Sequence, residues 1–317
     1  MKFSFLLIIL FSSYHTIRQE PKIIITKADK ELIPEGIAVH PKTGTIYLSS
    51  LHQNKIIAID KNGFVKDLIT EGQDGFMMGL GLKISLDGKT LWACSAYNDS
   101  ITHKTGLFQI DLKNGTVVQK FVFSDTVDIF FNDLVIDRNE NIYITDNQRS
   151  SVYKMNKKTN EVELWLKNDK LHWPNGITLS EDEKTLFVAA GDKGINAINI
   201  STKNIKTIAG PQTDFYAIDG LGFYKNTLIG VIGWPQDKPQ THRVLQYHLG
   251  ADYKLLKIDT LNINKQEVNC PTTLSITNDQ LYVLSKTNLG VYNRHNSNTS
   301  NIKDSLQPAT ILQYSLK

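Results

Sequence analysis

The sequence predicts an all-β protein, a six-bladed β-propeller with four antiparallel strands in each blade. The first observation is the dominance of short alternating runs rich in Ile, Val, Tyr, Phe and Thr, bounded by polar turns, with no sustained apolar spacing of three and four residues. The second is a unit of four strands that recurs at intervals of about 43 to 54 residues, a period typical of propeller blades. The residues that begin the six copies are Glu35, Leu80, Asn132, Asn175, Asp219 and Thr273.

Each copy divides into strands at its Gly-, Asn-, Asp- and Lys-rich turns. The first three blades are expected at 36–39, 45–50, 55–60 and 64–69; at 81–84, 91–95, 107–112 and 116–122; and at 134–137, 141–145, 151–155 and 162–166. The next two are expected at 176–179, 185–189, 195–200 and 205–209; and at 220–223, 228–232, 243–248 and 254–258. The sixth blade has only three such runs, at 274–276, 280–284 and 310–314, with a polar excursion over 293–307. An isolated strand at 22–26 is therefore expected to complete it from the other end of the chain, which leaves few edges exposed.

The first residues have the pattern of a secretory signal peptide, with Lys2 followed by an apolar run from Phe5 to Phe11 that is too short to cross a bilayer. We therefore expect residues 1–19 to be a signal peptide, residues 20–317 to form a single propeller domain, and the protein to be secreted or periplasmic. A buried first strand is the alternative for this segment. No later segment is long enough to be transmembrane.

Charge and cysteine content exclude several classes of partner. The net charge of +3 arises from 35 basic and 32 acidic side chains scattered along 317 residues, so we expect no nucleic-acid partner. Cys94 and Cys270 are the only cysteines, which excludes a disulfide framework and a cysteine-based zinc site. A single disulfide between them stays open at this stage.

The innermost strand of each blade lines the central channel, so the six copy-initiating positions are expected to form a ring at one mouth of it. Four of them carry carboxylate or amide oxygens: Glu35, Asn132, Asn175 and Asp219. Oxygen donors with a total charge of −2 suit a hard divalent cation, with Ca²⁺ as the first choice and Mg²⁺, Mn²⁺ or Zn²⁺ as alternatives. The competing interpretation is that Asn-Gly, Asp-Gly and Glu-Gly are turn sequences. Their common register favours the metal site.

Four short motifs at these positions resemble the metal-site signatures of the gluconolactonase and senescence-marker-protein family. That family consists of calcium-dependent six-bladed propellers related to paraoxonases and diisopropyl-fluorophosphatase. The resemblance covers about 33–285 and is carried by Pro34-Glu35-Gly36-Ile37, Asn132-Asp133, Pro174-Asn175-Gly176-Ile177 and Ile218-Asp219-Gly220-Leu221.

The resemblance implies roles for five residues. Glu35, Asn175 and Asp219 match the family's protein ligands to the catalytic metal, and Asn132 matches a position that binds metal or substrate. Asp133 is expected to orient its neighbour, because ligand side chains need a partner that fixes them. A plain turn aspartate is the alternative for Asp133.

The implied chemistry is hydrolysis of a small-molecule lactone or related ester. The metal polarises the carbonyl, and an acidic side chain takes the proton of the attacking water. Asp219 is our candidate for that base. His172 is a second candidate, as base or substrate contact, and its alternative role is to pack on Trp173.

The sequence departs from the family at two ring positions. Leu80 replaces a polar substrate-binding residue, and Thr273 and Ser275 stand where the fluorophosphatase-like pattern has an amide and a histidine. No arginine stands near 76–79 to hold sugar hydroxyls. We therefore expect a substrate more hydrophobic than a sugar lactone. Aromatic side chains are expected to wall the pocket or to fill gaps between blades: Phe130, Phe131, Trp173, Tyr216 and Trp234. The rival function is a non-catalytic propeller of the NHL kind that binds a protein or glycan through its loops.

Overall fold

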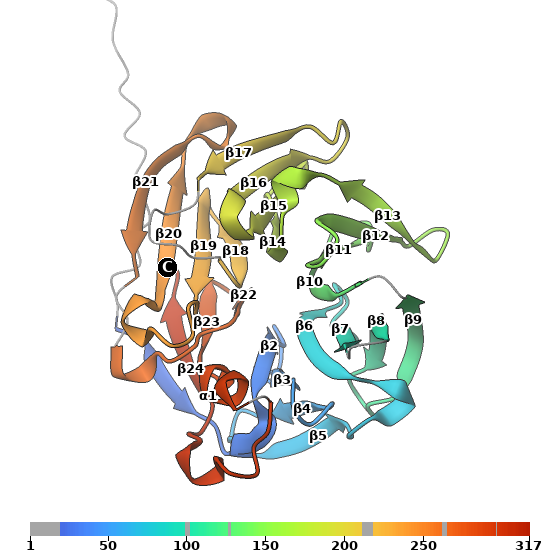
Figure 1. Cartoon of the computed structure of the whole chain (residues 1–317). Helices are drawn as coiled ribbons and strands as arrows, with labels where there is room; N and C mark the ends of the chain where they lie inside the picture. Colours follow the sequence, from blue (N-terminus) through green and yellow to red (C-terminus); the bar gives the residue numbers. More distant parts are fainter. Residues whose placement is uncertain (1–19, 99–101, 126–127, 211–217, 262–264, 296) are drawn as a thin grey trace, which may run out of the picture.

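Six four-stranded antiparallel sheets surround a central axis in the computed structural model (Figure 1). The structure describes residues 20–98, 102–125, 128–210, 218–261, 265–295 and 297–317. This arrangement confirms the predicted six-bladed propeller. The expected signal peptide, 1–19, lies outside the described residues.

Blades one to five each use four consecutive strands, numbered from the axis outward. Blade one comprises β2 (Pro34–Val39), β3 (Ile46–Ser50), β4 (Ile56–Ile59) and β5 (Val65–Ile69), and blade two β6 (Met78–Ile84), β7 (Thr90–Asn98), β8 (His103–Asp111) and β9 (Val117–Asp125). Blade three comprises β10 (Phe131–Ile136), β11 (Ile142–Asp146), β12 (Ser151–Asn156) and β13 (Glu161–Lys167), and blade four β14 (Pro174–Leu179), β15 (Thr185–Ala190), β16 (Gly194–Asn199) and β17 (Ile205–Ala209). Blade five comprises β18 (Leu221–Tyr224), β19 (Thr227–Ile232), β20 (Arg243–Leu249) and β21 (Leu255–Thr260).

The sixth blade joins the two ends of the described chain. Its order from the axis is β22 (Leu274–Thr277), β23 (Gln280–Lys286), β24 (Thr310–Ser315) and β1 (Lys22–Ile25). β1 pairs antiparallel with β24, with Ile24 opposite Ile311. The prediction that an N-terminal strand completes this blade is therefore confirmed.

The core consists of apolar layers between neighbouring blades. Inner strands such as β2 and β3 are buried along their whole length, whereas the outermost strand β5 exposes Lys66 and Asp67. The layers join successive blades; between blades four and five, for example, Phe187 stacks on Phe223 with ring centroids 5.4 Å apart. Burial of each sheet on both faces holds the blades at a fixed depth around the axis.

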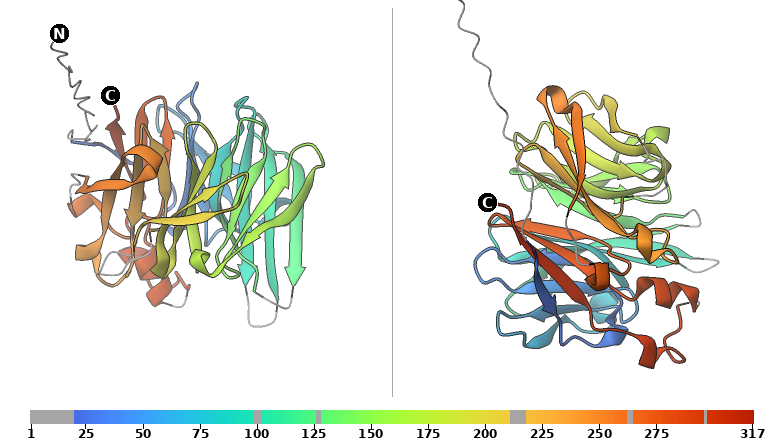
Figure 2. Two further views of the ribbon diagram at one scale, coloured as in Figure 1. Left: turned by 90° about the horizontal axis from the view of Figure 1, so that it is seen from above. Right: turned by 90° about the vertical axis from the view of Figure 1, so that its left-hand side faces the viewer.

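The polar excursion after β23 folds into a short segment on one face of the disc (Figures 1 and 2). It contains the helix α1 (Leu289–Arg294), and Tyr292, Ile302 and Leu306 of this segment pack on Ile33 of blade one. Short 3-10 turns also occur: η1 (Lys30–Leu32), η2 (Gln73–Gly75), η3 (Asp169–Leu171), η4 (Gly191–Lys193), η5 (Pro239–Thr241), η6 (Ala251–Tyr253), η7 (Lys265–Glu267) and η8 (Lys303–Ser305). The segment thus adds a second connection between the first and last blades.

Cys94 and Cys270 are both buried and free, so the disulfide left open by the sequence does not form. In the part of the chain that the structure describes, no helix has the length and apolar character needed to span a membrane.

Candidate metal centre

Four inner strands carry a β-bulge at the same register. The pairing of first and second strands shifts between Pro34 and Ile37, between Gly79 and Leu82, between Phe131 and Leu134, and between Pro174 and Ile177. Each bulge contains one ring residue and the residue after it. A bulge re-aims the side chain that it carries, and bulges are common beside functional sites. The common register seen in the sequence is therefore also a common backbone geometry.

The six predicted ring positions are neighbours in space, in the order of the blades. Glycine permits the approach: an added Cβ at Gly36 would lie 2.1 Å from the backbone oxygen of Leu80, and one at Gly176 would lie 2.4 Å from that of Asp219. An added Cβ at Gly81 would likewise lie 2.8 Å from the backbone oxygen of Asn132, and one at Gly220 would lie 2.6 Å from the Cα of Thr273. Any side chain there would strike the next blade, so these glycines are required by packing.

Hydroxyl groups make the other links of the ring. Thr145 Oγ1 donates to the carbonyl of Asn175 at 2.8 Å, and Thr272 Oγ1 donates to the carbonyl of Glu35 at 3.0 Å. In blade one, Ser49 Oγ accepts from the amide of Gly36 and donates to the carbonyl of Leu80 at 2.7 Å. The sequence reasoning missed these hydroxyls. The available signal was a Ser or Thr near the end of a second strand, at Ser49 and Thr145.

The two acidic side chains of the ring have raised pKa values, which favour their neutral form. Burial raises the pKa of Glu35 well above its usual range, and the nearby carboxylates of Asp219 and Asp133 add to the effect. Burial likewise raises the pKa of Asp219 to about 7, against the hydrogen bond that it receives from the Asn175 side chain. A divalent cation beside these groups would reverse both shifts, because it stabilises the ionised carboxylates.

Asp133 lies behind the ring and connects blades three and four. Its Oδ1 accepts from the amide of Leu134 at 2.8 Å, and its Oδ2 accepts from the amide of Ile177 at 3.4 Å. Burial raises its pKa, while the charge of Lys83 and these backbone hydrogen bonds oppose the rise. The side chain thus ties the strand that carries Asn132 to the strand that carries Asn175.

The donor set is one of oxygen atoms only. Within the described ranges, no group of three or more His, Cys, Asp and Glu side chains is arranged to hold a metal ion. The predicted set contains two such side chains, Glu35 and Asp219, and its other donors are the amides of Asn132 and Asn175. Two carboxylates with raised pKa values and two amides match the preferences of a hard cation better than those of a thiolate- or imidazole-binding metal.

His172 lies at the surface on the loop that leads into β14. Its Nδ1 is 2.8 Å from Asp192 Oδ1, and its ring stacks on Trp173 with centroids 4.2 Å apart. The His172 side chain is 40% exposed, so this pair is accessible to solvent. The expected packing on Trp173 is present, and a role for His172 as base or substrate contact stays a prediction.

The two departures from the family pattern differ in their surroundings. Leu80 is 3% exposed and belongs to the apolar layer between blades two and three, whereas Thr273 is partly exposed. Among the aromatic candidates, Trp173 and Trp234 are each 53% exposed, and Phe131 is fully buried against Phe123. Phe131 therefore fills the core, and Tyr216 lies outside the described residues.

Comparison with known proteins identifies the family of this chain and shows that its fold is shared. Residues 33–219 match the family described as SMP-30/gluconolactonase/LRE-like region, a span that begins just before Glu35 and ends at Asp219. No curated protein sequence matches the chain. Similar solved structures include a gluconolactonase from Xanthomonas campestris, with 15% identity, a TM-score of 0.63, and coverage of 94% of this chain and 95% of that one. The calcium-binding protein regucalcin from Agrobacterium tumefaciens has 15% identity, a TM-score of 0.60, and coverage of 90% and 91%. A PQQ-bound aldose sugar dehydrogenase from Streptomyces coelicolor is as similar in fold, with 13% identity, a TM-score of 0.64, and coverage of 95% and 99%. At these identities the structures establish the fold alone.

Proposed function

This chain belongs to the SMP-30/gluconolactonase/LRE-like family, and we propose that it is a metal-dependent hydrolase of lactones or related esters. The observation that carries the proposal is the ring: Glu35, Asn132, Asn175 and Asp219 stand at equivalent places on blades one, three, four and five. A binding module that works through its loops has no need of two carboxylates and two amides at one depth around the axis.

Glu35, Asn175 and Asp219 would hold the metal, with Asn132 as a fourth donor to metal or substrate. A bound Ca²⁺ supplies a positive charge that polarises the substrate carbonyl. Asp133 keeps the strands of Asn132 and Asn175 in register through its hydrogen bonds to backbone amides.

Asp219 is suited to take the proton of the attacking water. A cation bound beside it would keep its carboxylate ionised, which is the form that accepts a proton. His172 is the second candidate for this role, and its pairing with Asp192 leaves the ring of His172 at the surface. We further propose that residues 1–19 direct export of the protein.

The test is a metal titration followed by a substrate panel. The full chain, freed of metal with a chelator, is titrated with Ca²⁺, Mg²⁺, Mn²⁺ and Zn²⁺ by calorimetry and then assayed against sugar lactones, aliphatic lactones and aryl esters. We expect one metal ion per chain, tightest for Ca²⁺, and hydrolysis that depends on it. A metal-bound protein that hydrolyses none of the panel would contradict the reaction but not the site. A protein that neither binds metal nor hydrolyses any ester would support the binding-module alternative.

A further inference from the structure

A cleft lies between blades one and two, on the face opposite to the ring. β2 begins beside the ring at Pro34 and ends at Val39, so the turn that follows it lies at the far end of the blade. This turn and the β4–β5 turn of blade one face the β6–β7 and β8–β9 turns of blade two across a cleft of about 620 Å³. Cavities of about 300 to 1,000 Å³ hold small organic ligands.

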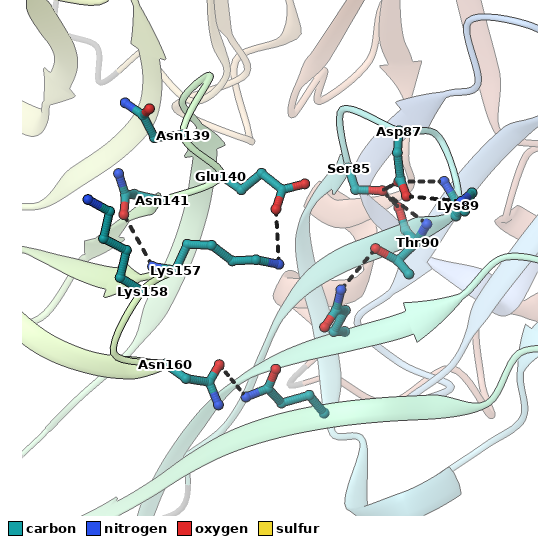
Figure 3. A network of polar contacts seen from close by, with 12 residues as sticks. Ser85, Asp87, Lys89, Thr90, Asn139, Glu140, Asn141, Lys157, Lys158 and Asn160 are labelled. Atoms are coloured by element: carbon teal, nitrogen blue, oxygen red, sulfur yellow. Dashed lines mark hydrogen bonds and ion pairs between the residues drawn. The ribbon is translucent and has the colours of Figure 1, made fainter.

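The equivalent position between blades two and three is closed. The cavity there measures only about 80 Å³. Polar contacts surround it: Glu140 Oε2 lies 3.0 Å from Lys157 Nζ (Figure 3). Gln109 Nε2 donates to Thr90 Oγ1 at 3.1 Å. At the outer edge, Gln119 Nε2 donates to Asn160 Oδ1 at 2.7 Å.

Blade two differs from blade three at the two positions that form the Glu140–Lys157 bridge. Gly88 stands where blade three has Glu140, since both have a positive φ, 73° and 62°, and both close their turn with the same backbone hydrogen bond. Leu112 occupies the position that Lys157 has in blade three. The preceding residues, Asp111 and Asn156, each accept a hydrogen bond from the backbone amide two residues further along the chain. The first cleft therefore lacks both members of the pair that spans the second.

A third difference, between blades one and two, makes the cleft deeper. Ala58 pairs with Tyr47 in blade one as Gln109 pairs with Trp92 in blade two. The small side chain of Ala58 leaves the space that Gln109 fills. The cleft is thus open because the sequence places Ala58, Gly88 and Leu112 at three equivalent positions.

The lining combines an apolar floor with cations at the rim. Tyr47, Ala58 and Leu68 form buried floor residues, and Phe64 is 67% exposed beside them. Three lysines, all exposed, line the same cleft: Lys66, Lys89 and Lys113.

The other charged and titratable groups that line the cleft are already engaged. Asp60 Oδ1 accepts from the amides of Asn62 and Phe64, and Asp111 Oδ1 accepts from that of Lys113. The ring of His40 bonds to the carbonyl of Gly88 and accepts from backbone amides of its own turn. Lys89 Nζ lies 3.9 Å from Asp87 Oδ2 in its own turn, so the positive charge offered to an anion comes chiefly from Lys66 and Lys113.

We propose that this cleft binds an amphipathic anion with an apolar body and a single carboxylate or sulfonate group. The apolar body would lie on the floor beside Phe64, and the anionic group would reach Lys66, Lys89 and Lys113. The site is independent of the metal centre, because the two lie at opposite ends of the blades.

Binding is measured with 8-anilinonaphthalene-1-sulfonate, by fluorescence, and with decanoate, by competition and by calorimetry. We expect saturable binding at one site per chain. The triple variant Ala58→Gln/Gly88→Glu/Leu112→Lys copies the three positions of the closed interface and is expected to weaken binding at least tenfold. Unchanged affinity in this variant would overturn the proposal.

A surface variant keeps the test independent of folding in the core. Lys66→Ala/Lys113→Ala is expected to weaken decanoate binding about tenfold and leave the binding of decanol, which lacks the charge, within about twofold. The matched control is Lys158→Ala, an exposed lysine that occupies the place of Lys113 in blade three and does not line the cleft, and it should bind like the unmodified protein. Equal losses for decanoate and decanol, or a loss in the control, would show that the lysines do not recognise the anionic group. Thermal midpoints of all variants are compared to confirm that each is folded.

Discussion

The ring positions of blades one and two share a backbone but differ in chemistry. Glu35-Gly36 and Leu80-Gly81 both lie in a bulge, and both glycines touch the backbone of the next blade. Yet Glu35 carries a carboxyl group with a raised pKa, and Leu80 is buried in an apolar layer. The bulge and the glycine are thus requirements of ring assembly, whereas the side chain beside the glycine is free to serve function. Substitutions should therefore separate stability from metal chemistry.

The largest effect is expected at Asp219. Asp219→Asn removes both a proposed charged ligand and the candidate base, so activity on the best lactone of the panel should fall at least about 100-fold. The matched control is Asp252→Asn, an exposed aspartate in blade five with a φ of 51°, which asparagine tolerates. Lactonase kinetics at saturating Ca²⁺ provide the measurement. Full activity in Asp219→Asn would remove this residue from the mechanism.

A glycine of the ring should affect folding more than metal chemistry. Gly176→Ala places a Cβ 2.4 Å from the backbone of blade five, so we expect a loss of about 3 kcal/mol in the free energy of unfolding. Gly210→Ala is the control, because a Cβ there meets nothing within 4 Å. Urea denaturation of the metal-free proteins measures the difference. Equal stability of the two variants would contradict the packing role of the ring glycines.

The pH dependence of stability should distinguish the acidic ring positions from the apolar one. In the metal-free protein the pKa of Asp219 is about 7, above its ordinary value of 3.8, so the folded state holds a proton that the unfolded state releases. The free energy of unfolding should therefore fall as pH rises from about 4 to about 7, by on the order of 3 kcal/mol. Asp219→Asn should reduce this slope, part of which the raised pKa of Glu35 maintains, whereas Leu80→Met should retain it in full. Urea denaturation across this pH range is the measurement, and a rising curve in the unmodified protein would contradict the assigned shift.

The smallest effect is expected at the last ring position. Thr273 contributes no donor to the predicted ligand set, so Thr273→Val should change the Ca²⁺ affinity by no more than about twofold. Calorimetric titration gives the affinity, with Glu35→Gln as the variant that should weaken it strongly. A large loss in Thr273→Val would extend the ligand set to the sixth blade.

The sequence predicted the fold and the ring register because both depend on local patterns. Alternation located the strands, and the period identified the equivalent residues from Glu35 to Thr273. The helix α1 was missed because its six residues are too few to show a helical period. The hydroxyl links of Ser49, Thr145 and Thr272 were missed because they join residues of different blades, which only the assembled ring brings together.

The cleft between blades one and two was also beyond the sequence reasoning, for a different reason. It arises from small or apolar side chains at Ala58, Gly88 and Leu112, and the significance of each depends on what occupies the same place in another blade. Such a difference becomes visible only when equivalent positions are superimposed. Repeat proteins therefore allow one interface to serve as the reference for the next.

The placement of β1 beside β24 has a consequence for biosynthesis. A ribosome makes β1 before every other described strand and β24 after all of them, so the sixth blade stays incomplete until β24 has been made. β24 lies between β1 and β23 in the sheet. A chain that lacks β24 therefore leaves both of these strands without the neighbour to which they hydrogen-bond. Prematurely terminated chains would expose the edges of both β1 and β23, which marks them for degradation or aggregation.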